Sequence, residues 1–246
     1  MQIGEVEMKK ILAILISLFL VVSFSFAGGS NFEIEKKLLK LQNSIVKNSF
    51  INLKPGAWAS YKDGSKAIYV GEDTIDGMKL RGIELHIRNN LIVQIWYKVV
   101  PKHFAYNGEN YKLLTLDPRV IFVQAGGMNI KLDYSQIQLI EQYYEVNDLS
   151  VILTPAKIYI DNNTNHKISI EETTVKVGSH AVKASVITSL DNGSKCFVSP
   201  EVPFGLIKTI PEGNPTLVNF SFAGASVSIN KSIRANAKAF SFPIGF

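Results

Sequence analysis

The sequence predicts an α+β fold in which a strongly bent, mainly antiparallel β-sheet carries helices packed on its concave side. Three observations support this prediction: an amphipathic helical pattern near the start, an apolar period of two from Ala57 onward, and turn signals between consecutive strands. Short turns join antiparallel neighbours, and helices set among runs of strands pack on one face of the sheet. The chain has 246 residues, of which 46% are hydrophobic, enough to bury one substantial core.

The first helix is expected over residues 33–48. Ser30-Asn31-Phe32-Glu33 has the pattern of a capping box, in which we expect the Ser hydroxyl and the Glu carboxylate to satisfy free N–H groups. Leu38, Leu41 and Ile45 then follow at helical spacing, and lysines occupy much of the remaining surface. We interpret this segment as a helix packed on the sheet, with contact to a membrane surface as the alternative.

Several strands are expected in the first half of the chain. Residues 83–88 alternate between apolar and polar, which predicts a strand with Glu84 and His86 on a solvent-exposed face. Leu91–Val100 is almost continuously apolar, which predicts a strand covered on both faces. Further strands are expected at 67–71, 118–124 and 129–134.

The second half of the chain predicts a helix followed by hairpins. Ser135-Gln136-Ile137-Gln138 is a second capping box, which opens a helix. Residues 157–170 are expected to form a hairpin, as are residues 181–199, where Asn192-Gly193 favours a tight turn. A last strand is expected at 217–222, while residues 226–240 fit either a strand or a helix.

The N-terminus indicates export. Lys9 and Lys10 precede an apolar run from Ile11 to Phe26, and Ser25-Phe26-Ala27 supplies small residues for a cleavage site. The run is shorter than the roughly 20 residues that span a bilayer, although an uncleaved anchor is the alternative. We therefore expect a signal peptide at residues 1–27, with Met1 or Met8 as the start, and a single β-rich domain at residues 28–246, located in the periplasm or cell envelope.

Motifs for enzyme chemistry are missing from the sequence. It contains no G-x-S-x-G, H-E-x-x-H, C-x-x-C or glycine-rich phosphate loop, so we expect neither an enzyme nor a cofactor or metal site. Cys196 is the only cysteine, and its apolar neighbours predict that it is buried. The net charge of +5 is not gathered into a dense Lys/Arg patch, which excludes a nucleic-acid interface and allows at most weak membrane-surface contact.

Two segments resemble a known class of proteins. Gly56-Ala57-Trp58-Ala59-Ser60-Tyr61 resembles the opening strand of uncharacterised exported bacterial proteins. Ser199-Pro200-Glu201-Val202-Pro203-Phe204-Gly205-Leu206-Ile207-Lys208, followed by the 216–222 strand, resembles their closing segment. Such proteins are similar to the periplasmic lipoprotein carriers (LolA-like, LppX-like). The resemblance implies a half-barrel that holds acyl chains beneath helices.

The remaining candidates for function are aromatic. These side chains either line a pocket for an acyl chain or fill the core, and the sequence leaves both possibilities open. We expect the protein to bind a hydrophobic ligand or an envelope lipoprotein without altering it, with a structural or assembly role in the envelope as the alternative; its oligomeric state stays open. The ligand-binding candidates are Trp96, Tyr97, Phe104, Phe122, Tyr144 and Phe204.

Overall fold

Two β-sheets make up most of the computed structural model, which describes residues 24–26, 32–87, 90–106, 108–143, 158–160, 168–190, 193–210 and 216–240. The larger sheet contains β2 (Trp58–Tyr61), β3 (Lys66–Ile75), β4 (Met78–Ile87), β5 (Leu91–Tyr106), β6 (Glu109–Ala125), β7 (Met128–Leu132), β13 (Leu217–Ser221) and β14 (Lys238–Ala239). The smaller sheet contains β9 (Ile168–Val177), β10 (His180–Ser189), β11 (Lys195–Val198) and β12 (Leu206–Ile210), and β1 (Phe24–Phe26) pairs with β8 (Ile158–Ile160). The helices are α2 (Phe32–Val46), the π-helix η1 (Lys47–Ile51), α3 (Tyr134–Tyr143) and α4 (Lys231–Ala235).

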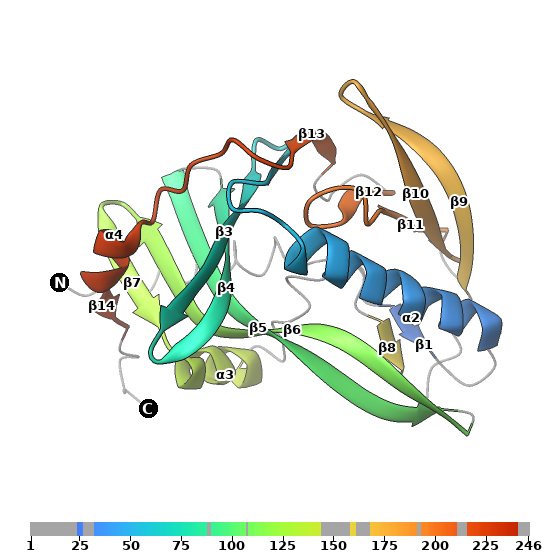
Figure 1. Ribbon diagram of the computed structural model, residues 1–246, viewed down its shortest axis with the longest axis horizontal. Coiled ribbons are helices and arrows are strands. Elements are labelled where there is room, and N and C mark those ends of the chain that lie inside the picture. The colour runs from blue at the N-terminus through green and yellow to red at the C-terminus, as the bar shows by residue number, and fades with distance from the viewer. Residues whose placement is uncertain are drawn as a thin grey trace.

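The larger sheet has the strand order β13-β2-β3-β4-β5-β6-β7-β14, and the smaller one has the order β12-β11-β10-β9 (Figure 1). Every pair in the two sheets is antiparallel except β7 with β14. The α+β class and the mainly antiparallel pairing expected from the sequence are therefore confirmed.

Helix α2 forms as predicted and packs between the two sheets. Its buried residues Leu38, Ile45 and Val46 belong to a core shared with both sheets, and the helix contacts β6 and β9. The helical spacing of these residues explains why one face of α2 is buried. Beyond Val46 the chain widens into η1, where the N–H of Asn52 donates to the carbonyl of Lys47 over 2.9 Å.

The first part of strand β5, residues 91–97, is buried on both faces, as its continuous apolar sequence predicts. Val93 and Ile95 lie in the core shared by the two sheets, together with Tyr97. Trp96 lies in a second core with Phe122, on the opposite face of the larger sheet. A register shift between Trp96 and Tyr97 adjusts the pairing of β5 with β6 at this point.

The C-terminal segment covers the second core. Ile229 is buried there, and α4 begins where the Asn230 side chain accepts a hydrogen bond from the N–H of Ile233 over 3.0 Å. The chain then forms β14 beside β7 (Figure 1). Residues 226–240, which the sequence left between strand and helix, thus contain a short piece of each.

One predicted hairpin is confirmed and another is wrong. Strands β10 and β11 pair in antiparallel fashion, as expected, while residues 191 and 192 of the predicted turn lie outside the described residues. The hairpin predicted over residues 157–170 does not form, because β8 and β9 belong to different sheets. Strand β9 instead pairs along its whole length with β10, across a turn in which Gly178 has a φ of +57°.

Among the ranges given above, no helix is long and apolar enough to cross a bilayer. Of the expected signal peptide, only β1 lies within the described residues.

Candidate functional site

The aromatic residues expected to bind a ligand are divided between the two cores. Trp96 and Phe122 are 1% and 3% exposed in the second core, while Tyr97 and Phe204 are buried in the shared core. None of these four side chains lines the groove described below. They fill the interior, which was the other possibility left open by the sequence. The Phe104 side chain and Tyr144 lie outside the described residues.

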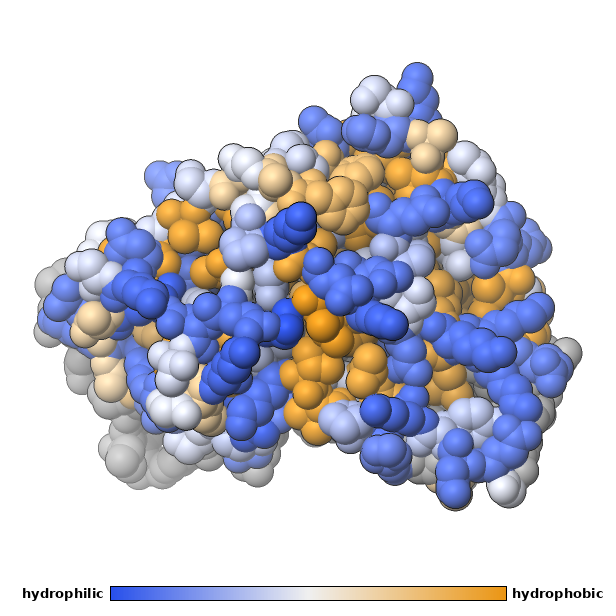
Figure 2. Space-filling view, viewed as in Figure 1, coloured by the Kyte–Doolittle hydropathy of each residue, from blue (hydrophilic) through white to orange (hydrophobic). Residues whose placement is uncertain are grey.

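An open groove of about 810 Å³ lies where the two sheets approach each other. Its walls come from the segment after η1, the start of β10, the loop before β12 and the end of β13. In the space-filling view, hydrophobic side chains gather near β13, between the two sheets (Figure 2). The lining residues are Asn52, Lys54, His180, Ala181, Val182, Glu201, Phe220, Ser221, Phe222 and Ala223.

An aromatic wall leads from the core to the mouth of the groove. Phe220 is buried, and its ring lies edge-on to that of Phe222 with 5.9 Å between centroids. The Phe220 ring also contacts the imidazole of His180, with 5.1 Å between the two ring centroids. Phe222 is 48% exposed, so the groove presents an apolar surface that folding leaves uncovered.

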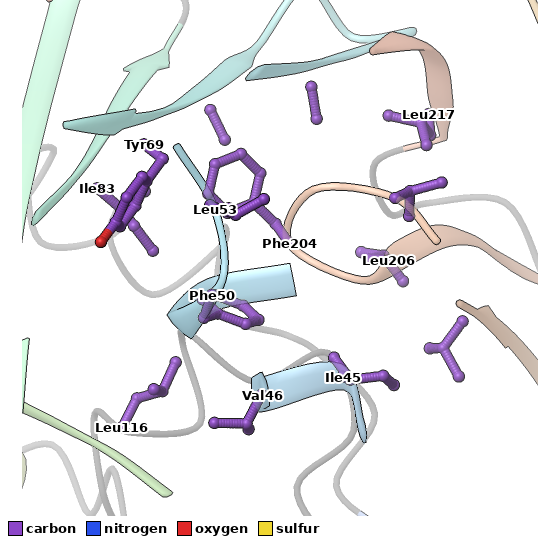
Figure 3. Packing of buried hydrophobic residues seen from close by; sticks show 14 of the residues in the cluster. Ile45, Val46, Phe50, Leu53, Tyr69, Ile83, Leu116, Phe204, Leu206 and Leu217 are labelled. Atoms are coloured by element: carbon purple, nitrogen blue, oxygen red, sulfur yellow. The ribbon is translucent and has the colours of Figure 1, made fainter. Parts of the chain in front are cut away.

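An unusual backbone arrangement joins the two segments that carry the lining residues Asn52 and Glu201. In the π-helix η1 the carbonyl of Ser49 accepts a hydrogen bond from the N–H of Phe204 over 3.1 Å. Phe204 adopts a φ of +64°, a left-handed conformation that disfavours a bulky side chain. Its ring packs against Phe50 of η1 with 5.9 Å between centroids, and this burial opposes the strain (Figure 3). Strained backbone and π-helices are concentrated at functional sites.

The same loop fixes Glu201 at the rim of the groove. The hydroxyl of Ser199 donates to the carbonyl of Lys183 over 2.6 Å and accepts from the N–H of Glu201 over 3.0 Å. The Oε2 atom of Glu201 accepts from the N–H of Lys183 over 3.0 Å. The carboxylate is therefore oriented by backbone contacts, and no described cation forms an ion pair with it.

A second polar cluster lies buried beneath the C-terminal segment. The Glu84 side chain is 0% exposed and accepts a hydrogen bond from Nε2 of His86 over 2.8 Å and from Nε2 of Gln94 over 3.0 Å. It also accepts from the N–H groups of Ser228 and Ile229 over 2.7 and 2.8 Å. Burial would raise the pKa of Glu84, but these hydrogen bonds, led by that of His86, hold its pKa below the usual value.

The cluster continues from Gln94 to the surface. Oε1 of Gln94 accepts from Nε1 of Trp96 over 2.8 Å and from Arg234 over 3.2 Å. The Arg234 guanidinium lies over the Trp96 ring, 4.8 Å from its centroid, and pairs with Asp73 over 2.6 Å. Side chains of β3, β4, β5 and α4 are thus joined in one network that fastens the C-terminal segment to the sheet.

The solvent-exposed position predicted for Glu84 is wrong, and His86 is half-buried rather than fully exposed. The alternation of residues 83–88 correctly predicts which residues share a face, but the backbone at 228–229 covers that face. The one local indication of this buried cluster in the sequence is Gln94, a polar residue inside an apolar run. Burial of its side chain is unfavourable unless hydrogen-bond partners satisfy it.

Cys196 is buried, as predicted, and burial raises the pKa of its thiol to about 12. A thiol with that pKa carries almost no thiolate at neutral pH, which makes it a poor nucleophile. Among the described residues, no three His, Cys, Asp or Glu side chains lie close enough together to hold a metal ion.

No family model, curated protein or solved structure matches this chain. The candidate site therefore rests on the geometry of the groove.

Proposed function

We propose that this protein is an exported, non-enzymatic protein of the cell envelope that binds a hydrophobic ligand, the acyl chain of a lipid or lipoprotein, in the groove beside β13. The observation that carries the proposal is the aromatic wall of Phe220 and the half-exposed Phe222 in an open groove of about 810 Å³. This volume falls within the range of about 300–1,000 Å³ that is usual for ligand pockets.

The composition of the groove favours an acyl chain over a polar ligand. Phe222 and two alanines supply exposed apolar surface next to the buried Val182 and Phe220. The other five lining residues are polar: Asn52, Lys54, His180, Glu201 and Ser221. Transfer of an alkyl chain onto such a surface gains roughly 25 cal/mol for each Å² of apolar area removed from water. The apolar contact then provides most of the affinity, and the polar side chains fix the orientation of the ligand.

In this proposal the larger sheet acts as a bent half-barrel, with α2 on its concave side. The length of β5 and β6, at 16 and 17 residues, and the packing of α2 against β6 support that arrangement (Figure 1). The groove then lies at the end of the half-barrel, where β13 is the edge strand.

A titration with a fatty acid that carries an anthroyloxy fluorophore tests the proposal. We expect Phe222→Ser to weaken binding about tenfold or more, because a phenyl ring contributes about 1.5–3 kcal/mol when it is covered. Leu190→Ser is the matched control, since Leu190 is 58% exposed and does not line the groove. Equal affinities for the wild type and Phe222→Ser would contradict the proposal.

A structural or assembly role is the second candidate. Val218 and Phe222 are exposed on and just beyond the edge strand β13, and exposed apolar residues at a sheet edge suit a protein partner. Under this candidate, Phe222→Ser would abolish co-purification of an envelope protein and leave fatty-acid binding unchanged. Cross-linking in the native envelope, compared between Phe222→Ser and Leu190→Ser, separates the two candidates.

A further inference from the structure

The rim of the groove carries two opposite charges that are not paired with each other. Lys54 and Glu201 both line the groove, and no ion pair involves either of them in the described part of the chain. Charged side chains elsewhere in the described part of the chain do pair, as Lys79 does with Glu72 over 2.9 Å. A cation and a carboxylate held apart beside one apolar surface leave both charges free for a ligand.

The two charges differ in how they are held. Glu201 is fixed through its own N–H, bonded to Ser199, and through its Oε2 atom, bonded to the backbone of Lys183. Its other oxygen, Oε1, is not used in that contact and is available to a donor. Lys54 extends from the segment between η1 and β2, and its ammonium group is strongly hydrated and flexible. The site therefore combines an oriented acceptor with a mobile cation.

Two further donors, from His180 and Asn52, complete the rim. The His180 ring is placed by its contact with Phe220, and the Asn52 side chain lies in the same lining. Both carry N–H groups suited to an anionic oxygen. Together with Lys54 they provide donors for a phosphate, while Glu201 provides the acceptor for an ammonium group.

From this arrangement we infer that the ligand is a glycerophospholipid whose head group is zwitterionic. The inference rests on the acyl-chain binding proposed above and adds the head group to it. Lys54, His180 and Asn52 take the phosphate, Glu201 takes the ammonium group, and the acyl chains lie against Phe220 and Phe222. A purely anionic head group would place a second negative charge near Glu201, which is unfavourable.

The test uses two lipids with identical chains, dihexanoyl phosphatidylethanolamine and dihexanoyl phosphatidylglycerol. Each is titrated below its aggregation concentration against the protein loaded with the anthroyloxy fatty acid. We expect the zwitterionic lipid to displace the probe at roughly threefold to fivefold lower concentration, the size of effect that exposed ion pairs produce. Glycerophosphoethanolamine, the same head group without chains, should displace nothing at equal concentration.

Two variants test whether the charged residues at the rim cause the preference for the zwitterionic lipid. Glu201→Gln retains an acceptor for the Lys183 N–H and should remove the difference between the lipids, while Lys54→Gln should weaken both. Glu171→Gln and Lys195→Gln, at exposed positions outside the groove, are the matched controls and should behave as the wild type.

The outcomes distinguish the two proposals. Equal displacement by both lipids, or a preference that survives in Glu201→Gln, would overturn the head-group inference while leaving acyl binding intact. Displacement by glycerophosphoethanolamine alone would overturn it in favour of a small polar ligand. Failure of the probe itself to bind would overturn the proposed function.

Discussion

The Glu84 network and the groove beside β13 differ in whether their charged and apolar groups find partners within the chain. Glu84 is fully buried, and His86, Gln94 and two backbone N–H groups bond to it. In the groove, Phe222 is half-exposed, and Lys54 and Glu201 lack ion-pair partners in the described residues. In the Glu84 network the buried carboxylate is bonded to donors of the same chain, whereas the groove leaves charged and apolar surface open to solvent.

This difference separates a structural role from a binding role. A buried carboxylate is tolerated only when donors satisfy it, and the donors here include the backbone of the C-terminal segment. Glu84 therefore stabilises the position of that segment. The apolar surface of the groove, left open beside charges without ion-pair partners in the described residues, is accessible to another molecule, in keeping with the binding role proposed for it.

The largest effect is expected from Glu84→Ala. Removing the carboxylate leaves the N–H groups of Ser228 and Ile229, and the Nε2 group of Gln94, without that acceptor. We expect the free energy of unfolding to fall by about 3–5 kcal/mol, the usual cost of removing one member of a buried charged cluster. Urea denaturation measures it, with Glu171→Gln as a surface control. A loss below about 1 kcal/mol would show that the network does not hold the segment.

Acid should weaken the same region. The pKa of Glu84 is held below its usual value, and so is that of Asp73, where burial acts upward but hydrogen bonds and the nearby cations Lys231 and Arg234 outweigh it. A carboxyl group with a depressed pKa contributes stability above its unfolded value, near pH 4.3 for Glu, and that stability is lost as pH falls further through the folded pKa.

Denaturation midpoints of the wild type and Glu84→Gln across pH 7 to about pH 3 test this expectation. The wild type should lose stability more steeply on acidification, because its Glu84 takes up a proton that the glutamine lacks. Parallel curves would mean that Glu84 has the same pKa in the folded and unfolded protein.

The smallest effect on stability is expected at the groove. Phe222→Ser should change the free energy of unfolding by no more than about 0.5 kcal/mol, as is usual for a surface substitution, while it weakens fatty-acid binding. Urea denaturation of this variant, next to the binding titration, keeps the two properties apart. A large loss of stability would assign Phe222 to the fold and remove the contrast between the two regions.

Local patterns predict the elements of this fold better than they predict its sites. The helical spacing of Leu38 and Ile45 and the turn signal at Asn192-Gly193 act over a few residues, and both the helix and the pairing of β10 with β11 are confirmed. The groove brings together residues from 52 to 223 that only tertiary packing makes neighbours. Aromatic content alone therefore pointed to Trp96 and Tyr97, whose apolar neighbours on β5 place them in the cores.

The most direct test of the central claim is native mass spectrometry of protein released gently from its own envelope. We expect the wild-type protein to carry added masses that fragment to lipid acyl chains, and we expect these masses to be retained in Leu190→Ser and lost in Phe222→Ser. Spectra of the wild type without any lipid mass, from a preparation that remains folded, would contradict it. So would lipid masses retained equally by Phe222→Ser, because the ligand would then lie outside the groove.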